Sequence, residues 1–166
     1  MNVCGIDPGK TGGIILLDHN ANLLDMAVMP MIGREIDHVK LREIFAFYKS
    51  LGELHCFLEK VSAFQGASAT SSFEFGRVFG AAECAVKIMG IPVTYLTPTQ
   101  WTRAMHKGLD QSMKPKDKSM ITYRRLFPNV DLRATDDCKV AHDGLVDAIL
   151  IAECGRRVLF HRGENG

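Results

Sequence analysis

The chain has 166 residues, of which 46% are hydrophobic and 23% charged, and its formal net charge is +1. These values are ordinary for a soluble protein and predict one globular domain over residues 1–166. They exclude a membrane-spanning protein, because no apolar run reaches the ~18–20 residues of a span. The five cysteines are never spaced as C-x-x-C, which argues against a zinc ribbon or disulfide framework and for a reducing compartment. We therefore expect a cytoplasmic protein with no membrane partner.

The predicted elements alternate between strands and helices. Short turns separate the first three strands, which predicts an antiparallel meander, while the unbroken apolar run 54–59 indicates a strand buried on both faces. Apolar residues at helical spacing, followed by Gly52 and Gly90, predict the first two helices and their ends. We expect strands at 2–7, 13–18, 23–29, 54–59 and 91–96, helices at about 37–51, 72–89, 97–105, 117–127 and 141–160, and loops at 62–72 and 107–117.

The order of these elements is that of the ribonuclease H fold. Three strands come first, then a helix, a strand, a helix, a strand and the remaining helices. We predict an α/β protein with a mixed five-stranded sheet and helices on both of its faces. In such sheets, sites gather where neighbouring strands lead their connections to opposite sides.

Four acids stand where this fold would bring them together. Asp7 and Glu59 end two apolar strands, and Asp143 and Asp147 share one face of the last helix, about 5–6 Å apart. Buried carboxylates are costly and repel one another, so a pair of divalent metals between them is the natural candidate. The pattern favours a metal-dependent phosphoryl-transfer site. The alternative role for Asp143 is that of an acid interacting with the helix dipole.

Residues around Asp7 argue against two kinds of nucleotide-binding loop. Segment 5–11 (GIDPGKT) has three residues between its glycines, one of them an acid, whereas a Walker A loop needs four. The Asp-x-Gly-x-Thr loop of sugar kinases and actin-like ATPases belongs to proteins that pair two such domains, and this chain has room for one. We do not expect ATP hydrolysis.

Basic residues are concentrated in segment 101–125. It contains seven Lys or Arg and two acids, a local charge of +5 in a nearly neutral chain. Such a segment indicates a polyanionic partner. The alternative is a solvated helix face followed by a loop.

Taken together, these residues resemble the RuvC family of Holliday junction resolvases, most closely its bacteriophage members. The resemblance spans nearly the whole chain, and a spacing of four between the last two acids is that of phage and chloroplast relatives. If the gene is carried by a phage, the host cytoplasm is the expected location. The segments that match, in the family's order, are 5–9 (GIDPG), 58–61 (LEKV), 75–77 (FGR), 97–101 (TPTQW), 116–118 (KDK), 125–128 (RLFP) and 142–153 (HDGLVDAILIAE).

The resemblance implies hydrolysis of two DNA phosphodiesters placed symmetrically across a four-way junction. Two Mg²⁺ (Mn²⁺ is the alternative) about 3.5–4 Å apart would be held by the four acids. Asp7 would bridge both ions, Glu59 would serve one, and Asp143 and Asp147 the other. His142 is the alternative to Asp143.

Further residues are expected to contact the junction. Lys118 lies where the family carries a basic residue beside the cleaved phosphate, although a plain phosphate contact or a solvent-facing position is the alternative. Phe64, with Gln65, is expected to stack on an unpaired base, or else to anchor its loop in the core. Trp101 is expected to pack. The expected contacts to the DNA backbone are Arg77, Lys107, Lys114, Lys116 and Arg124.

Paired cuts require two active sites, so the resemblance implies a homodimer. Gly76 and Gly80 on one helix would allow close approach of a second backbone, either in that dimer or between helix and sheet. Two other functions stay open. One is a less selective nuclease of the same fold that cuts branched, flapped or RNA-containing duplex, and the other is a non-catalytic junction-binding protein.

Overall fold

The computed structural model describes residues 1–60 and 68–160. Five strands form one mixed sheet in the order β3-β2-β1-β6-β7, and two further two-residue strands form a separate hairpin. The strands are β1 (Asn2–Asp7), β2 (Gly13–Leu17), β3 (Leu23–Val28), β4 (Met31–Ile32), β5 (Glu35–Ile36), β6 (Leu54–Glu59) and β7 (Val93–Leu96). The sequence prediction did not include β4 and β5.

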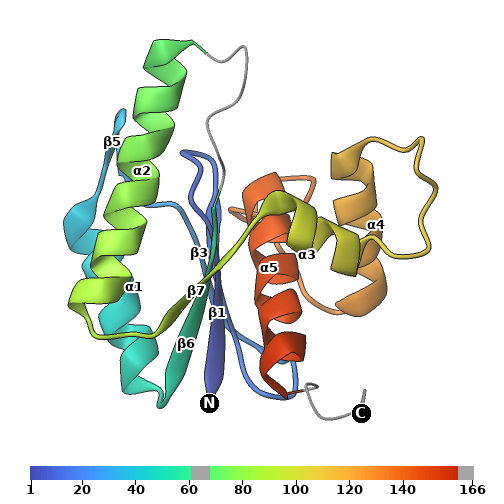
Figure 1. The fold of residues 1–166 in the computed structure, drawn as a ribbon, viewed down its shortest axis with the longest axis horizontal. Helices are drawn as coiled ribbons and strands as arrows, with labels where there is room; N and C mark the ends of the chain where they lie inside the picture. The colour runs from blue at the N-terminus through green and yellow to red at the C-terminus, as the bar shows by residue number, and fades with distance from the viewer. Residues whose placement is uncertain (61–67, 161–166) are drawn as a thin grey trace.

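Helices cover both faces of the sheet, as predicted (Figure 1). In Figure 1, α1 and α2 lie to the left of the sheet, and α3, α4 and α5 lie to its right. No helix among the described residues is long and apolar enough to cross a membrane. The helices are α1 (His38–Ser50), α2 (Ala69–Ile88), α3 (Pro98–Met105), α4 (Pro115–Leu126) and α5 (Asp143–Phe160).

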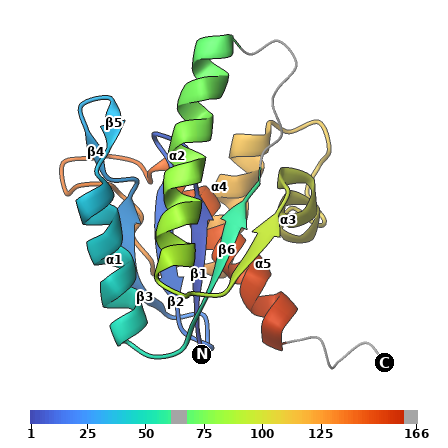
Figure 2. The same cartoon turned by 60° about the vertical axis from the view of Figure 1, so that its left-hand side comes forward.

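Alternation along the strands produces two cores, one on each face of the sheet. On β1, Val3 faces the core formed with α3, α4 and α5, whereas Cys4 and Ile6 face the core formed with α1 and α2. Figure 2 shows the same layers turned, with β6 and β7 at one side of the sheet and α1 and α2 over its nearer face. The two central strands, β1 and β6, are therefore covered on both faces, as their unbroken apolar sequences predicted.

The predicted boundaries differ from the observed ones at the helix starts. Helix α2 begins at Ala69 rather than near 72, because the Ser68 hydroxyl accepts a hydrogen bond from the Ser71 N–H. Helix α4 begins at Pro115 rather than 117, since proline suits the first turn of a helix. Phe64 and Gln65 lie outside the described residues.

Helix α5 packs directly on the central strand. A Cβ added to Gly5 would stand 2.2 Å from the Ala148 carbonyl oxygen, so only glycine allows this approach. A Cβ on Gly144 would stand 2.1 Å from the Thr11 carbonyl oxygen, and Gly12 and Gly144 form a backbone bridge. The start of α5 is thereby fixed against the loop that follows Asp7.

Candidate active site

Three of the four predicted acids gather at one end of the sheet. Asp7 and Glu59 are the last residues of β1 and β6, two parallel neighbours whose register pairs Ile6 with Leu58, so both acids leave the sheet at the same edge. Asp147 lies on the second turn of α5, which begins at this upper end of the sheet in Figure 1. All three side chains are partly buried.

The surroundings of Asp7 disfavour its charge. Burial, and then the charges of Glu59 and Asp147, raise the pKa of Asp7 to about 7, from an ordinary value of 3.8. The Gly9 N–H opposes this rise by donating a hydrogen bond to Oδ1 at 3.1 Å. Because neighbouring carboxylates raise this pKa, the three acids form one electrostatic unit.

Glu59 is held by the single tryptophan of the chain. Trp101, on α3, donates a hydrogen bond from Nε1 to Glu59 Oε1 at 2.7 Å. Burial raises the pKa of Glu59, the Trp101 bond opposes that rise, and the charge of Asp147 adds to it. Trp101 was expected to pack, and it does, since it is only 4% exposed. Its second role as a hydrogen-bond donor was missed.

Asp147 is supported from α4. Burial raises its pKa, the nearby Ser119 hydroxyl opposes the rise, and the charge of Asp143 adds to it. Ser119 is itself 5% exposed and lies on the buried face of α4. The sequence carried no signal for Ser119, because a serine in a helix usually faces solvent.

Asp143 stands apart from the other three acids. Its side chain is 57% exposed and forms an ion pair with Lys116 on α4, with 2.6 Å between Nζ and Oδ2. Asp143 affects the pKa of Asp147 but does not contribute to the shifts of Asp7 or Glu59. Its alternative, His142, has a buried Nδ1 atom without a hydrogen-bond partner in the part of the chain that the structure describes.

The donor set fits a hard divalent cation. Carboxylate oxygens are the ligands that Mg²⁺ and Mn²⁺ take in proteins. Burial first, and then neighbouring carboxylates, raise the pKa values of Asp7, Glu59 and Asp147, so a cation among them would be favoured. Within residues 1–60 and 68–160, no three His, Cys, Asp or Glu side chains converge closely enough to form a ready ligand group. Mutual repulsion keeps carboxylates apart when no cation lies between them.

Basic side chains line a hollow between α3 and α4. A cavity of about 1040 Å³ lies between α3, the following loop and the start of α4. Lys107 and Lys118 line it together with Arg103, and the Lys118 ammonium donates to the Gln111 carbonyl oxygen at 3.1 Å. Lys114 is exposed at the N-terminal cap of α4.

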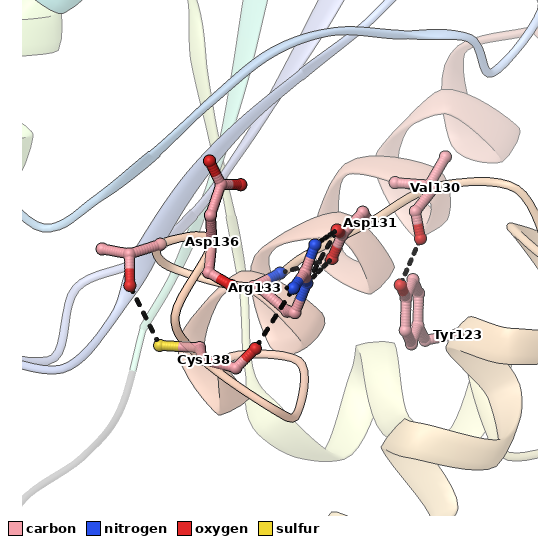
Figure 3. Close-up of polar contacts among 7 residues, drawn as sticks. Tyr123, Val130, Asp131, Arg133, Asp136 and Cys138 are labelled. Carbon is pink, nitrogen blue, oxygen red and sulfur yellow. Dashed lines mark hydrogen bonds and ion pairs between the residues drawn. The ribbon is translucent and has the colours of Figure 1, made fainter.

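The remaining predicted DNA contacts lie on other surfaces. Arg77 on α2 is exposed and makes a two-pronged ion pair with Glu35. Arg124 lines a separate hollow of about 560 Å³, next to the loop that precedes α5. In that loop Arg133 is held by Asp131 and by the carbonyl oxygens of Asp136 and Cys138, as Figure 3 shows.

An exposed aromatic on α2 was not predicted to have a role. Phe73 is 67% exposed, and the Arg77 guanidinium carbon lies 6.0 Å from the centre of its ring. The spacing of four residues on a helix was the only sequence signal for this pair.

Comparisons with known proteins agree on the architecture. No family model and no curated protein matches the chain. The Thermus thermophilus RuvC structure is 21% identical, with a TM-score of 0.66 and 97% of both chains covered. T. thermophilus RuvC in complex with a Holliday junction substrate is 20% identical, with a TM-score of 0.68, covering 93% of this chain and 92% of that one.

A third similar structure is the yeast mitochondrial Holliday junction resolvase Ydc2. It is 11% identical, with a TM-score of 0.51, covering 93% of this chain and 77% of that one. At these identities the likeness establishes the fold. The predicted ribonuclease H-like α/β fold is therefore confirmed.

We predict that the metal-free protein loses stability as the pH rises from 3.8 to about 7, because folded Asp7 keeps its proton in this range and the unfolded chain does not. Asp7→Asn should therefore melt higher than the parent in EDTA, by roughly 5–10 °C at pH 8 and by less than half of that at pH 5. Thermal melts followed by circular dichroism test this. Asp117→Asn, an exposed acid on α4, should show no such pH-dependent gain, and an equal gain at both pH values would contradict the prediction.

Proposed function

We propose that this protein is a metal-dependent, structure-selective DNA endonuclease that resolves four-way junctions by paired phosphodiester hydrolysis. One observation carries the proposal: Asp7, Glu59 and Asp147 form a buried acidic cluster at the end of β1 and β6. Two of the similar structures support the choice of substrate: one is T. thermophilus RuvC in complex with a Holliday junction substrate, and the other is the yeast mitochondrial Holliday junction resolvase Ydc2.

Asp7, Glu59 and Asp147 would hold Mg²⁺ or Mn²⁺, with Asp143 or His142 as the fourth ligand. A bound divalent ion supplies a water of lowered pKa and neutralises charge on the phosphate. The chain's own residues must keep the acids ionised and oriented. The Gly9 N–H and the Trp101 indole contribute by donating to Asp7 and Glu59, which orients both carboxyl groups and favours their ionised forms in part.

The basic residues between α3 and α4 would bind the DNA backbone. Lys107 and Lys114 are exposed, and Lys107 lines the large hollow between the two helices. Lys118 in the same hollow stays our candidate for contact with the cleaved phosphate. These contacts would provide affinity without sequence choice, because phosphates carry no sequence information.

Two other functions are weaker explanations of the site. A non-catalytic junction-binding protein has no use for three partly buried acids, of which Glu59 and Asp147 raise the pKa of Asp7 and Asp147 raises that of Glu59. A less selective nuclease of the same fold would have the same acids but would not need a dimer. Cleavage of a synthetic four-way junction, with linear duplex, flap and RNA–DNA hybrid as controls, separates these functions. Paired cuts confined to the junction support the proposal, and equal cleavage of all four substrates overturns it.

A homodimer is part of the proposal, and α2 offers a surface for it. Among residues 1–60 and 68–160, neither Gly76 nor Gly80 has a neighbour within 4 Å of the position a Cβ would occupy, so the packing of α2 on this part of the chain does not require these glycines. Phe73 and Ile88, near the two ends of α2, are 67% and 79% exposed. Two copies could approach closely at the glycines.

We expect Asp7→Asn to reduce junction cleavage at least a hundredfold while junction binding in Ca²⁺ stays within about threefold of the parent, because this charge is needed for metal and not for DNA affinity. Cleavage and gel-shift assays with one junction measure both. Asp143→Asn should behave in the same way if Asp143 is the fourth ligand, whereas Asp117→Asn should cleave normally. Cleavage by Asp7→Asn within tenfold of the parent would refute the assignment.

We expect Lys107→Ala with Lys114→Ala to weaken binding to all branched DNA alike and to lower the slope of log affinity against log salt by roughly 1–2, one unit for each lost phosphate contact. Titrations between 50 and 200 mM salt measure this slope. Lys40→Ala with Arg42→Ala removes the same charge from α1, on the opposite face of the sheet, and should leave the slope unchanged. Equal slopes for the parent and both double variants would show that Lys107 and Lys114 face solvent and do not contact DNA.

We expect Gly80→Arg to convert a dimer into a monomer, because the new side chain fills the space that a second backbone would occupy. Light scattering after size-exclusion chromatography gives the mass. Ala46→Arg, which adds the same side chain on the exposed face of α1, should stay dimeric. A parent protein that is monomeric at micromolar concentration, alone and with junction DNA, speaks against the dimer.

A further inference from the structure

A layer of polar side chains from α3 and α4 lies behind the acids. Trp101 donates from Nε1 to Glu59 Oε1 at 2.7 Å, and its indole is 4% exposed. An indole has one N–H and no acceptor. It therefore fixes one oxygen of the Glu59 carboxylate and leaves the other available to a ligand.

Asp147 is supported in the same way from α4. The Ser119 hydroxyl, 5% exposed, acts on the Asp147 carboxyl, since it opposes the rise in the pKa of that acid. The same hydroxyl lies 3.2 Å from His106 Nε2, which can donate to it and leave the Ser119 proton free to face the acid. The contact with His106 thus fixes the orientation of the Ser119 hydroxyl toward Asp147.

His106 joins the two supports. Its ring stands edge-on to the Trp101 indole, with 5.7 Å between ring centres and an angle of 78° between planes. The order Glu59, Trp101, His106, Ser119, Asp147 is therefore a continuous series of contacts that begins on β6 and ends on α5. It links two acids that belong to distant parts of the sequence.

We propose that Trp101 and Ser119 are positioning residues that orient Glu59 and Asp147 for a divalent cation. His106, which contacts both Trp101 and Ser119, fixes the positions of these two side chains relative to each other. The inference rests on the proposed function, since it concerns the same acids. Hydrogen bonds that orient ligand side chains contribute to metal affinity, and removing them costs typically about 10- to 100-fold.

The variants separate orientation from packing. Trp101→Phe keeps an aromatic ring in the core and removes the N–H, and Ser119→Ala removes only the hydroxyl. Two controls remove equivalent donors that bond to carbonyl oxygens instead of acids. Tyr123→Phe loses the bond from the tyrosine hydroxyl to the Val130 carbonyl (Figure 3), and Thr122→Val loses the bond from the threonine hydroxyl to the Met105 carbonyl.

Two readouts are needed, neither of which is catalytic. The first is the Mn²⁺ dissociation constant, from titration calorimetry. The second is the difference in melting temperature between saturating Mg²⁺ and EDTA. A residue that only packs lowers the melting temperature equally in both buffers, whereas a positioning residue reduces the difference, because weaker binding to the folded state stabilises it less.

We expect Trp101→Phe to raise the Mn²⁺ dissociation constant at least tenfold and Ser119→Ala to raise it several-fold, each with a smaller Mg²⁺-dependent melting shift. Both controls should keep the parent values. An unchanged constant in Trp101→Phe and Ser119→Ala, or an equal loss in the controls, overturns the inference while the proposed function stands.

If the parent itself binds no divalent cation, the proposed function fails, and the inference with it. If Trp101→Phe does not fold, the inference is tested by comparing the Mn²⁺ dissociation constants of Ser119→Ala and its control Thr122→Val. As the only tryptophan, Trp101 also gives an independent signal. Mn²⁺ should quench its emission in the parent and in Ser119→Ala, at a higher Mn²⁺ concentration in the variant. Quenching of the parent and of Ser119→Ala at the same Mn²⁺ concentration would contradict a positioning role for Ser119.

Discussion

The close packing of α5 on β1 decides where the acids lie. The Ala148 carbonyl stands so near Gly5 that no side chain fits between strand and helix, and Gly144 is in similar contact with the loop after Asp7. Asp147 precedes Ala148 on the same helix, so this contact also sets its position relative to Asp7. A methyl group added at Gly5 would displace α5 and move Asp147 away from Asp7. The proposed function would then be lost.

This arrangement is costly without a cation, and the surrounding donors reduce the cost only in part. The Gly9 N–H and the Trp101 indole donate to Asp7 and Glu59, and the Ser119 hydroxyl opposes the pKa rise of Asp147, yet all three acids keep a raised pKa. The rest of the fold must outweigh this repulsion with two apolar cores. A site that is destabilising when empty is typical of function rather than of packing.

Local patterns in the sequence predicted the strands, the helices and the acids at strand ends. Asp7 and Glu59 could be found because each follows an unbroken apolar run, and the order of elements placed those runs side by side. The ion pair of Lys116 with Asp143 and the bond from Trp101 to Glu59 could not be predicted, because each joins segments 27 or 42 residues apart. Phe64 and Gln65, outside the described residues, stay predictions from sequence alone.

The near-neutral net charge hides a separation of charge that the proposed function requires. Acids are partly buried at the ends of β1 and β6, while exposed Arg103 stands on α3 and exposed lysines stand on α4 and in the segment between the two helices. A DNA phosphate approaching three carboxylates is repelled unless cations lie within about one Debye length, roughly 8 Å at physiological salt. Lys116 acts on one of the three acids in this way: its charge opposes the rise in the pKa of Asp147, while its ammonium is bonded to Asp143 at 2.6 Å. The basic side chains of α1 lie on the other face of the sheet and do not meet this condition. The position of the charges in segment 101–125, rather than their total, is therefore the relevant property.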